Sequence, residues 1–90
     1  MPNSYPKEEH IRYIEPRARR MAAEKQLQFV DVVAQSATEA RNYLVRVRKS
    51  PHEILHTLRV PLELVERCID ASSDNELVAK LDEELAKRLA

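Results

Sequence analysis

Glycine is absent from this chain of 90 residues. Ordinary usage of about 7% would predict roughly six glycines in a chain of this length. Phosphate-cradling loops, dinucleotide-binding turns and nucleophile elbows all need glycine where the backbone approaches a ligand closely. The absence therefore argues against those enzyme classes together, and we expect a non-enzymatic protein without a cofactor. It also predicts that tight turns with positive φ use other residues.

Cysteine and long apolar runs are scarce as well. Cys68 is the single cysteine, which excludes a disulfide within the chain, and its apolar neighbours at helical spacing predict a buried position. No apolar run approaches the ~18 residues needed to span a bilayer, and residues 1–20 are too polar for a secretory signal. These features predict a soluble, cytoplasmic protein without a membrane partner.

The chain is instead rich in charged residues, which make up 33% of it beside 43% hydrophobic residues. This composition is typical of a helix-rich globular domain with a thin core. The formal net charge is zero, but residues 1–50 carry ten Lys and Arg against six Asp and Glu, whereas residues 51–90 carry five against nine. The two halves therefore differ in sign, which favours docking on a charged partner.

Prolines and apolar spacing predict the elements of the first half. Pro6 opens a short element and Pro16 ends it, so residues 1–15 are expected to form a loosely packed N-terminal arm. Residues 17–49 contain neither proline nor glycine, and they predict one long central helix, or two helices that meet near Gln35. Apolar residues spaced by three and four form a stripe that would pack in the core or form a dimer seam: Val30, Val33, Ala37, Ala40, Leu44 and Val47.

Capping signals divide the second half into three helices. Ser50, Pro51 and Glu53 predict a helix to about Leu58, and Pro61 with Glu63 predicts another to about residue 71. Ser73 and Glu76 predict a terminal helix, and its apolar face comprises Leu77, Val78, Leu81, Leu85 and Leu89. No segment alternates with period two for more than a few residues. The expected fold is all-α, a compact bundle of about five helices forming a single helical domain over residues 1–90.

His52, Glu53 and His56 form an H-E-x-x-H pattern that resembles the zincin metalloprotease signature. In that family two histidines on one helical face bind zinc and the glutamate activates water. Here Pro51 confines the pattern to a helix start, and no strand is expected beside it. The sequence therefore favours a neutral pair on a helix surface, with His52 and His56 as remote candidates for a metal site.

Residues 50–69 resemble a helix-turn-helix motif. Ile54 and Leu58 fit the apolar positions of the first helix, Val60 fits the turn, and Val65 with Cys68 or Ile69 fits the second helix. Carboxylates on the outer side of the second helix would oppose DNA phosphates, so a protein-docking role is favoured over a DNA-binding one. The residues that this role predicts at a protein interface are Leu62, Glu63, Glu66 and Arg67.

A basic patch is expected from Arg41, Arg46, Arg48 and Lys49. It would contact an acidic protein or a phosphate backbone. The sequence therefore predicts a small interaction protein, such as an adaptor, an inhibitor or a regulatory subunit, that binds a protein partner and can form a homodimer. The alternative is a helix-turn-helix transcriptional regulator that binds nucleic acid, and a zinc-binding protein is a remote third.

Overall fold

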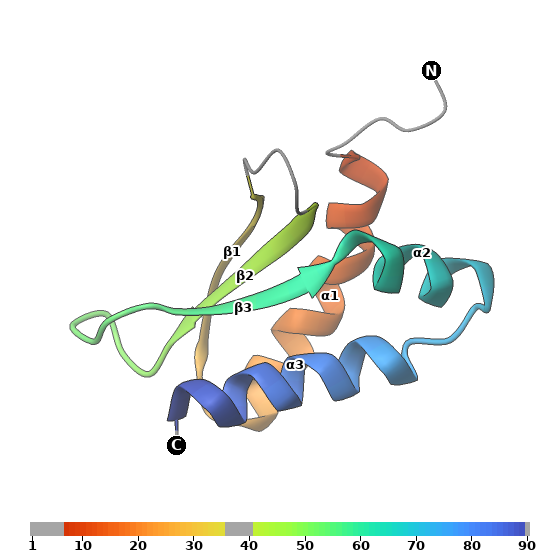
Figure 1. Ribbon diagram of the computed structural model, residues 1–90. Helices are drawn as coiled ribbons and strands as arrows, with labels where there is room; N and C mark the ends of the chain where they lie inside the picture. The colour runs from red at the N-terminus through yellow and green to blue at the C-terminus, as the bar shows by residue number, and fades with distance from the viewer. Residues whose placement is uncertain (1–6, 36–40, 90) are drawn as a thin grey trace.

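The computed structural model describes residues 7–35 and 41–89 and shows a mixed α/β fold (Figure 1). In that part of the chain three helices accompany one three-stranded antiparallel sheet, with strands in the order β1-β2-β3. The expected all-α bundle of five helices is therefore wrong. Along the chain the elements are α1 (Glu8–Glu24), β1 (Gln28–Ala34), β2 (Asn42–Arg48), β3 (His56–Pro61), α2 (Leu62–Asp70) and α3 (Asn75–Leu89).

The expected long central helix is replaced by the end of α1 and the strands β1 and β2. β2 alternates with period two, because Tyr43, Val45 and Val47 are fully buried whereas the residues between them are half-buried. β-branched and aromatic residues of this kind favour a pleated, half-buried surface. The predicted stripe is therefore not a helical seam, since Val30 and Val33 lie on β1 and its last two residues on β2. Residues 37 and 40 of that stripe lie outside the described residues.

A β-bulge explains why β1 imitates helical spacing. The register with β2 shifts between Phe29 and Asp31, so Val30 is an extra residue on that strand. Phe29 and Val32 consequently pack on the same core although they are three residues apart. Spacing by three is the signature of a helix in a regular segment, but the bulge produces it here in a strand.

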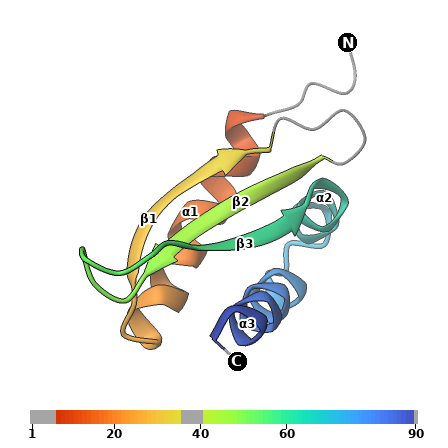
Figure 2. The same cartoon turned by 60° about the vertical axis from the view of Figure 1, so that its left-hand side comes forward.

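The helices lie on one face of the sheet (Figure 2). α1 packs mainly against β1 and α3 mainly against β3, while α2 contacts both of these helices. The buried apolar residues form one cluster between the sheet and the helices, in which Ile14, Tyr43, Leu58, Leu77 and Leu81 are among the largest fully buried side chains. The opposite face of the sheet carries none of the described helices.

Proline signals were correct in part. α1 passes through Pro16, so this residue does not end the first element, and residues 8–15 belong to this helix and contribute buried side chains such as Ile14. Residues 1–6 of the predicted arm lie outside the described residues. Ser50 and Pro51 lie in the loop between β2 and β3 instead of starting a helix. Pro61 does directly precede a helix, and the predicted terminal helix is confirmed as α3, with Leu77, Leu81 and Leu85 buried.

Two turns use positive φ without glycine, as the composition predicts. Gln26 has φ 61° after α1 and Ser72 has φ 52° after α2. In each turn the next residue donates its N–H to a carbonyl five residues back, at Ala22 and Cys68 respectively. This is the Schellman arrangement, in which the left-handed residue ordinarily is glycine. Cys68 itself is buried, as its spacing predicts.

Candidate interaction surface

The open face of the sheet, which no described helix covers, is the candidate functional site. Its register follows from the pairs Val33–Leu44 and Leu44–Arg59 at the centre and Asp31–Arg46 and Arg46–Thr57 beside them. Neither Val33 nor Leu44 belongs to the core cluster or to the partly buried residues packed against it, and both are half-buried. We define the open face by these residues and the next pair along: Gln28, Asp31, Val33, Leu44, Arg46, Arg48, Thr57 and Arg59.

Arginines surround the apolar centre of this face. The Arg46 guanidinium forms a two-pronged salt bridge with Asp31, and the Nε–Oδ1 hydrogen bond measures 2.6 Å. Hydrogen bonding to Arg46 lowers the pKa of Asp31, with its charge adding to the effect and burial opposing it. Arg48 donates to the side chain of Gln28, whereas the Arg59 side chain is exposed. The face therefore has one compensated acid and a net positive charge.

The predicted basic patch is brought together only in part, because its four residues are spread along the length of β2. Arg46 and Arg48 share the open face, while Arg41 directly precedes the strand and Lys49 directly follows it. Arg59 from β3 joins these residues but was not predicted, because it is distant in sequence from the others. Its position between the buried Leu58 and Val60 is the signal that could have identified it as facing outward.

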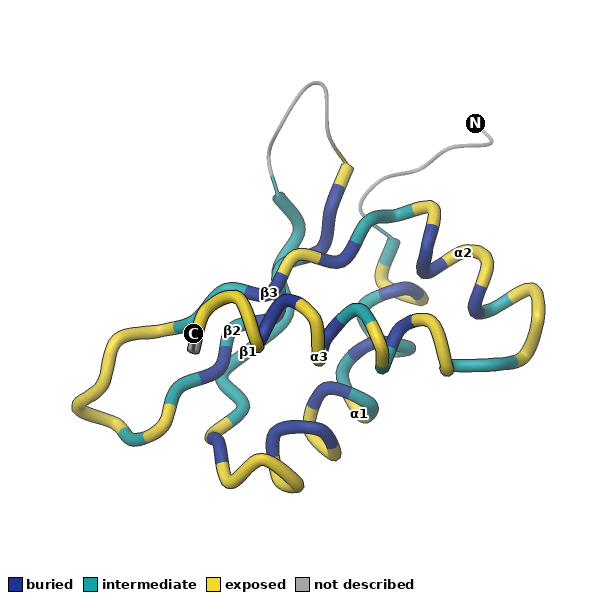
Figure 3. Tube along the Cα trace, turned by 60° about the horizontal axis from the view of Figure 1, so that its bottom comes forward, coloured by how far each residue is buried: buried dark blue, intermediate teal, exposed yellow. Residues whose placement is uncertain are grey.

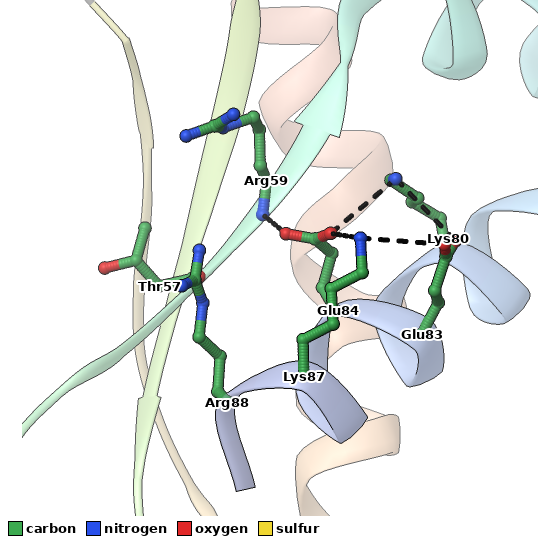
Figure 4. Close-up of polar contacts among 7 residues, drawn as sticks. All are labelled: Thr57, Arg59, Lys80, Glu83, Glu84, Lys87 and Arg88. Atoms are coloured by element: carbon green, nitrogen blue, oxygen red, sulfur yellow. Dashed lines mark hydrogen bonds and ion pairs between the residues drawn. The ribbon is translucent and has the colours of Figure 1, made fainter. Parts of the chain in front are cut away.

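α3 fixes the outer edge of the sheet at β3 (Figure 4). The buried carboxylate of Glu84 accepts a hydrogen bond from the Arg59 backbone N–H at 3.2 Å, and Arg88 donates to the carbonyl of Thr57 at 3.1 Å. Lys80 and Lys87 form ion pairs with Glu84. Burial raises the pKa of Glu84, but the Arg59 hydrogen bond and the two lysines outweigh it and lower the pKa overall. These contacts hold β3, and with it Arg59, in place.

The loop between β2 and β3 is exposed along most of its length (Figure 3). Ile54 is 77% exposed and Leu55 is 41% exposed, and these are the exposed large hydrophobic residues of the described chain. Ile54 was expected to pack inside a helix pair, so its exposure is a correction. The loop follows Arg48 and Lys49 directly, which places two apolar side chains next to the basic end of β2.

The zincin-like pattern does not lie on a helix. His52 and Glu53 are in the exposed loop and His56 begins β3, so the spacing that would place both histidines on one helical face is lost. The metalloprotease geometry is thus absent. Within residues 7–35 and 41–89 no group of three or more His, Cys, Asp or Glu side chains is arranged to hold a metal ion.

The helix-turn-helix resemblance is also wrong, because its first half is a loop followed by β3. The predicted protein-interface residues lie on α2, where spacings of three and four make Glu63, Glu66 and Arg67 neighbours on the helix surface. Leu62 packs against the core, and Glu63 and Arg67 line a groove of about 460 Å³ between α2 and α3. Glu66 lines a different pocket, together with Lys7 and His10. This arrangement removes the helix-turn-helix geometry on which the DNA-binding hypothesis depended.

A buried polar pair connects α1 to β2. The Tyr43 hydroxyl lies 2.8 Å from Nδ1 of His10 and accepts the backbone N–H of Lys7 at 3.1 Å. The hydroxyl can donate to Nδ1 or accept from Nδ1–H, because its oxygen has a second lone pair, so the direction of this hydrogen bond follows the tautomer of His10. Burial, and then the charge of Lys7, lower the pKa of His10, while Glu66 and Glu9 partly oppose the shift. The pair positions the start of α1 and belongs to the scaffold rather than to the open face.

Comparisons with known protein families, with curated proteins and with solved structures found no match for this chain. None of the helices in the described part of the chain combines the length and the apolar character that crossing a bilayer requires.

Proposed function

We propose that this chain is a non-enzymatic interaction protein whose open face docks on an acidic and partly apolar surface of a protein partner. The observation that supports the proposal is the uncovered sheet face, where the pair Val33–Leu44 is flanked by Arg46, Arg48 and Arg59. Interfaces combine an apolar centre with polar surroundings, and arginine is enriched among residues that contribute most to binding. Acidic groups on the partner would orient the complex and accelerate its formation.

The composition of the open face favours protein over nucleic acid as the partner. Sheets that bind single-stranded nucleic acid do so largely by stacking bases on aromatic side chains. Phe29 lies on the helix side of β1 beneath the Arg19 guanidinium, and Tyr43 is fully buried. The open face as defined contains no aromatic residue, so its apolar contacts suit aliphatic side chains of a protein.

The exposed loop extends this surface. Ile54 and Leu55 follow the basic end of β2 and would provide an apolar anchor beside Arg48 and Lys49. Anchors of this kind fill pockets on a partner and contribute much of the binding energy. The proposal includes a cytoplasmic location, which is supported by the single, buried cysteine of the chain.

The test uses a defined acidic probe, a fluorescein-labelled peptide of alternating glutamate and leucine, in an anisotropy titration at low and moderate salt. We expect saturable binding that weakens as salt rises, because exposed charges are screened. The double variant Arg48→Glu, Arg59→Glu should weaken binding at least about tenfold, since it places like charge opposite the probe.

The matched control is the double variant Arg12→Glu, Lys25→Glu, which makes the same change in net charge on exposed positions of α1 and its C-terminus. Binding that is unaffected by this control but lost in the sheet variant would support the open face. An equal loss of peptide affinity in both variants would show that overall charge causes the effect, and it would contradict the proposal. Stronger binding of a mixed-sequence single-stranded RNA than of the peptide would replace the protein partner with nucleic acid.

A further inference from the structure

The two edges of the sheet differ in how their outward backbone groups are used. On β3 the outward N–H of Arg59 and the outward carbonyl of Thr57 are bonded to Glu84 and Arg88 of α3. On β1 no hydrogen bond from a described residue outside the sheet reaches the backbone of residues 28–34. An open strand edge is a template for pairing with another strand, and proteins ordinarily cover or charge it.

The outward groups of β1 can be assigned from the ladder. The backbone N–H and carbonyl groups of successive residues point in opposite directions along an antiparallel strand. Because those of Thr57 and Arg59 point outward, those of Leu58 and Val60 bond to β2. On β2 the same alternation directs Leu44 and Arg46 toward their partners Val33 and Asp31 on β1. The hydrogen bond from the Gln35 N–H to the Asn42 carbonyl, at 2.9 Å, agrees with this phase.

Val32 and Ala34 therefore direct their N–H and carbonyl groups away from the sheet. Both side chains pack against the core on the helix side. The strand has strong β-propensity and carries one charge, Asp31, which Arg46 compensates within the same molecule. Neither a lysine nor a proline interrupts β1.

The geometry points to a second copy of this chain as the partner of β1, paired antiparallel about a two-fold axis at Val33. This register pairs Val32 of each copy with Ala34 of the other, so that the outward groups of these residues exchange hydrogen bonds. It places Val33 opposite its own symmetry mate on the open face, as an apolar cross-strand pair. Asp31 then faces Gln35 rather than another carboxylate, and the bulge at Val30 lies away from the axis.

The consequence is one continuous six-stranded sheet with the helices of both copies on the same side. Symmetric pairing through a shared patch is the commonest form of homodimer. A single strand pair is a small interface, so the dimer is expected to be weak, with a dissociation constant in the micromolar range or above. This pairing uses the edge of β1 and does not depend on the docking role of the open face.

Sedimentation equilibrium of the full chain between about 10 µM and about 1 mM tests the pairing, over a range suited to a weak interface. We expect a monomer–dimer equilibrium whose dissociation constant rises at least about tenfold in Val33→Lys, because two ammonium groups then meet across the axis. The matched control Thr57→Lys adds the same charge to the same face on β3 and should leave the equilibrium unchanged.

Amide hydrogen exchange of the wild type provides a second test of the pairing, and it does not depend on whether a variant folds correctly. In the wild type, the amides of Val32 and Ala34 should become protected as concentration rises, whereas that of Val33 is protected throughout by β2. A monomer at every concentration would overturn the proposal, as would a dimer equally weakened by both lysine variants. A dimer that leaves the amides of Val32 and Ala34 unprotected would also overturn it, because another face would then form the contact.

Discussion

Gln26 and Ser72 hold the left-handed backbone conformation that ends α1 and α2. A side chain in this conformation crowds the backbone and costs about 1 kcal/mol or more, whereas glycine adopts it freely. We therefore expect Gln26→Gly to raise the free energy of unfolding by about 0.5–1 kcal/mol, because relief of this strain exceeds the entropy that glycine adds to the unfolded chain. Urea denaturation monitored by circular dichroism measures the change.

The neighbouring residue provides the control for this substitution. Lys25 has φ −93° and lies outside the left-handed region, so Lys25→Gly should lower stability rather than raise it. If both glycine variants shifted the denaturation midpoint in the same direction, the benefit at Gln26 would not come from its backbone conformation.

His10 makes stability depend on pH near neutrality. Burial and the charge of Lys7 lower its pKa below the ordinary value of 6.5, against the opposing charges of Glu66 and Glu9. The unfolded chain therefore binds the proton more readily than the folded one, so this contribution to stability is complete above pH 6.5 and is lost as pH falls below it. We expect the urea midpoint to fall between about pH 7 and about pH 5.

The variant His10→Asn keeps a polar amide group at the position of Nδ1, beside the Tyr43 hydroxyl, but does not titrate. The urea denaturation midpoint of this variant should change less over this pH interval than the midpoint of the wild type. Asp31 and Glu84 contribute little to the change over this interval, because their pKa values are lowered from 3.8 and 4.5 and their contributions are lost mainly below about pH 5. An unchanged pH dependence in the variant would show that His10 is not responsible.

Among the elements, α3 stabilises the fold by covering the edge of β3. Replacing Glu84 with alanine removes the acceptor of the Arg59 N–H and leaves Lys80 and Lys87 without their buried partner. We expect Glu84→Ala to lower the free energy of unfolding by about 1–3 kcal/mol, the range for a buried hydrogen bond to a charged group. Chemical denaturation measures the loss.

Glu83 is the matched control on the same helix. Its carboxylate is more than half exposed and pairs with Lys80 and Lys87. Because exposed ion pairs contribute little, Glu83→Ala should cost less than about 1 kcal/mol. A similar loss in both variants would mean that the contact with β3 is not what Glu84 contributes.

Elements defined by local signals were predictable, and those defined by pairing were not. The proline before α2 and the apolar face of α3 are local, and both helices appear where the sequence places them. The bulge at Val30 gave β1 the spacing of a helix, and the absence of glycine and proline between residues 17 and 49 concealed the strand ends. The alternation of Tyr43, Val45 and Val47 with Arg46 and Arg48 was the available evidence for β2.

In the whole molecule, the open face depends on strand register, which joins residues that are distant in sequence. Arg46 and Arg48 were predicted in one patch because they are close in sequence, whereas Arg59 and the pair Val33–Leu44 join them only through the sheet. Local patterns such as H-E-x-x-H were misleading for the same reason, since they assume an element that long-range pairing replaces. The sequence thus grouped two arginines of the candidate site, Arg46 and Arg48, but did not predict a face with an apolar centre.

The most direct test of the open face maps the binding of the acidic peptide onto the molecule by nuclear magnetic resonance. Peptide is titrated into ¹⁵N-labelled protein, and the amides whose resonances shift are assigned. We expect the shifts to concentrate at Leu44, Arg46, Arg48 and Arg59, with smaller shifts in the loop at Ile54. Shifts concentrated instead on the groove residues Glu63, Arg67 and Lys80 would contradict docking through the sheet and assign the interaction to α2 and α3.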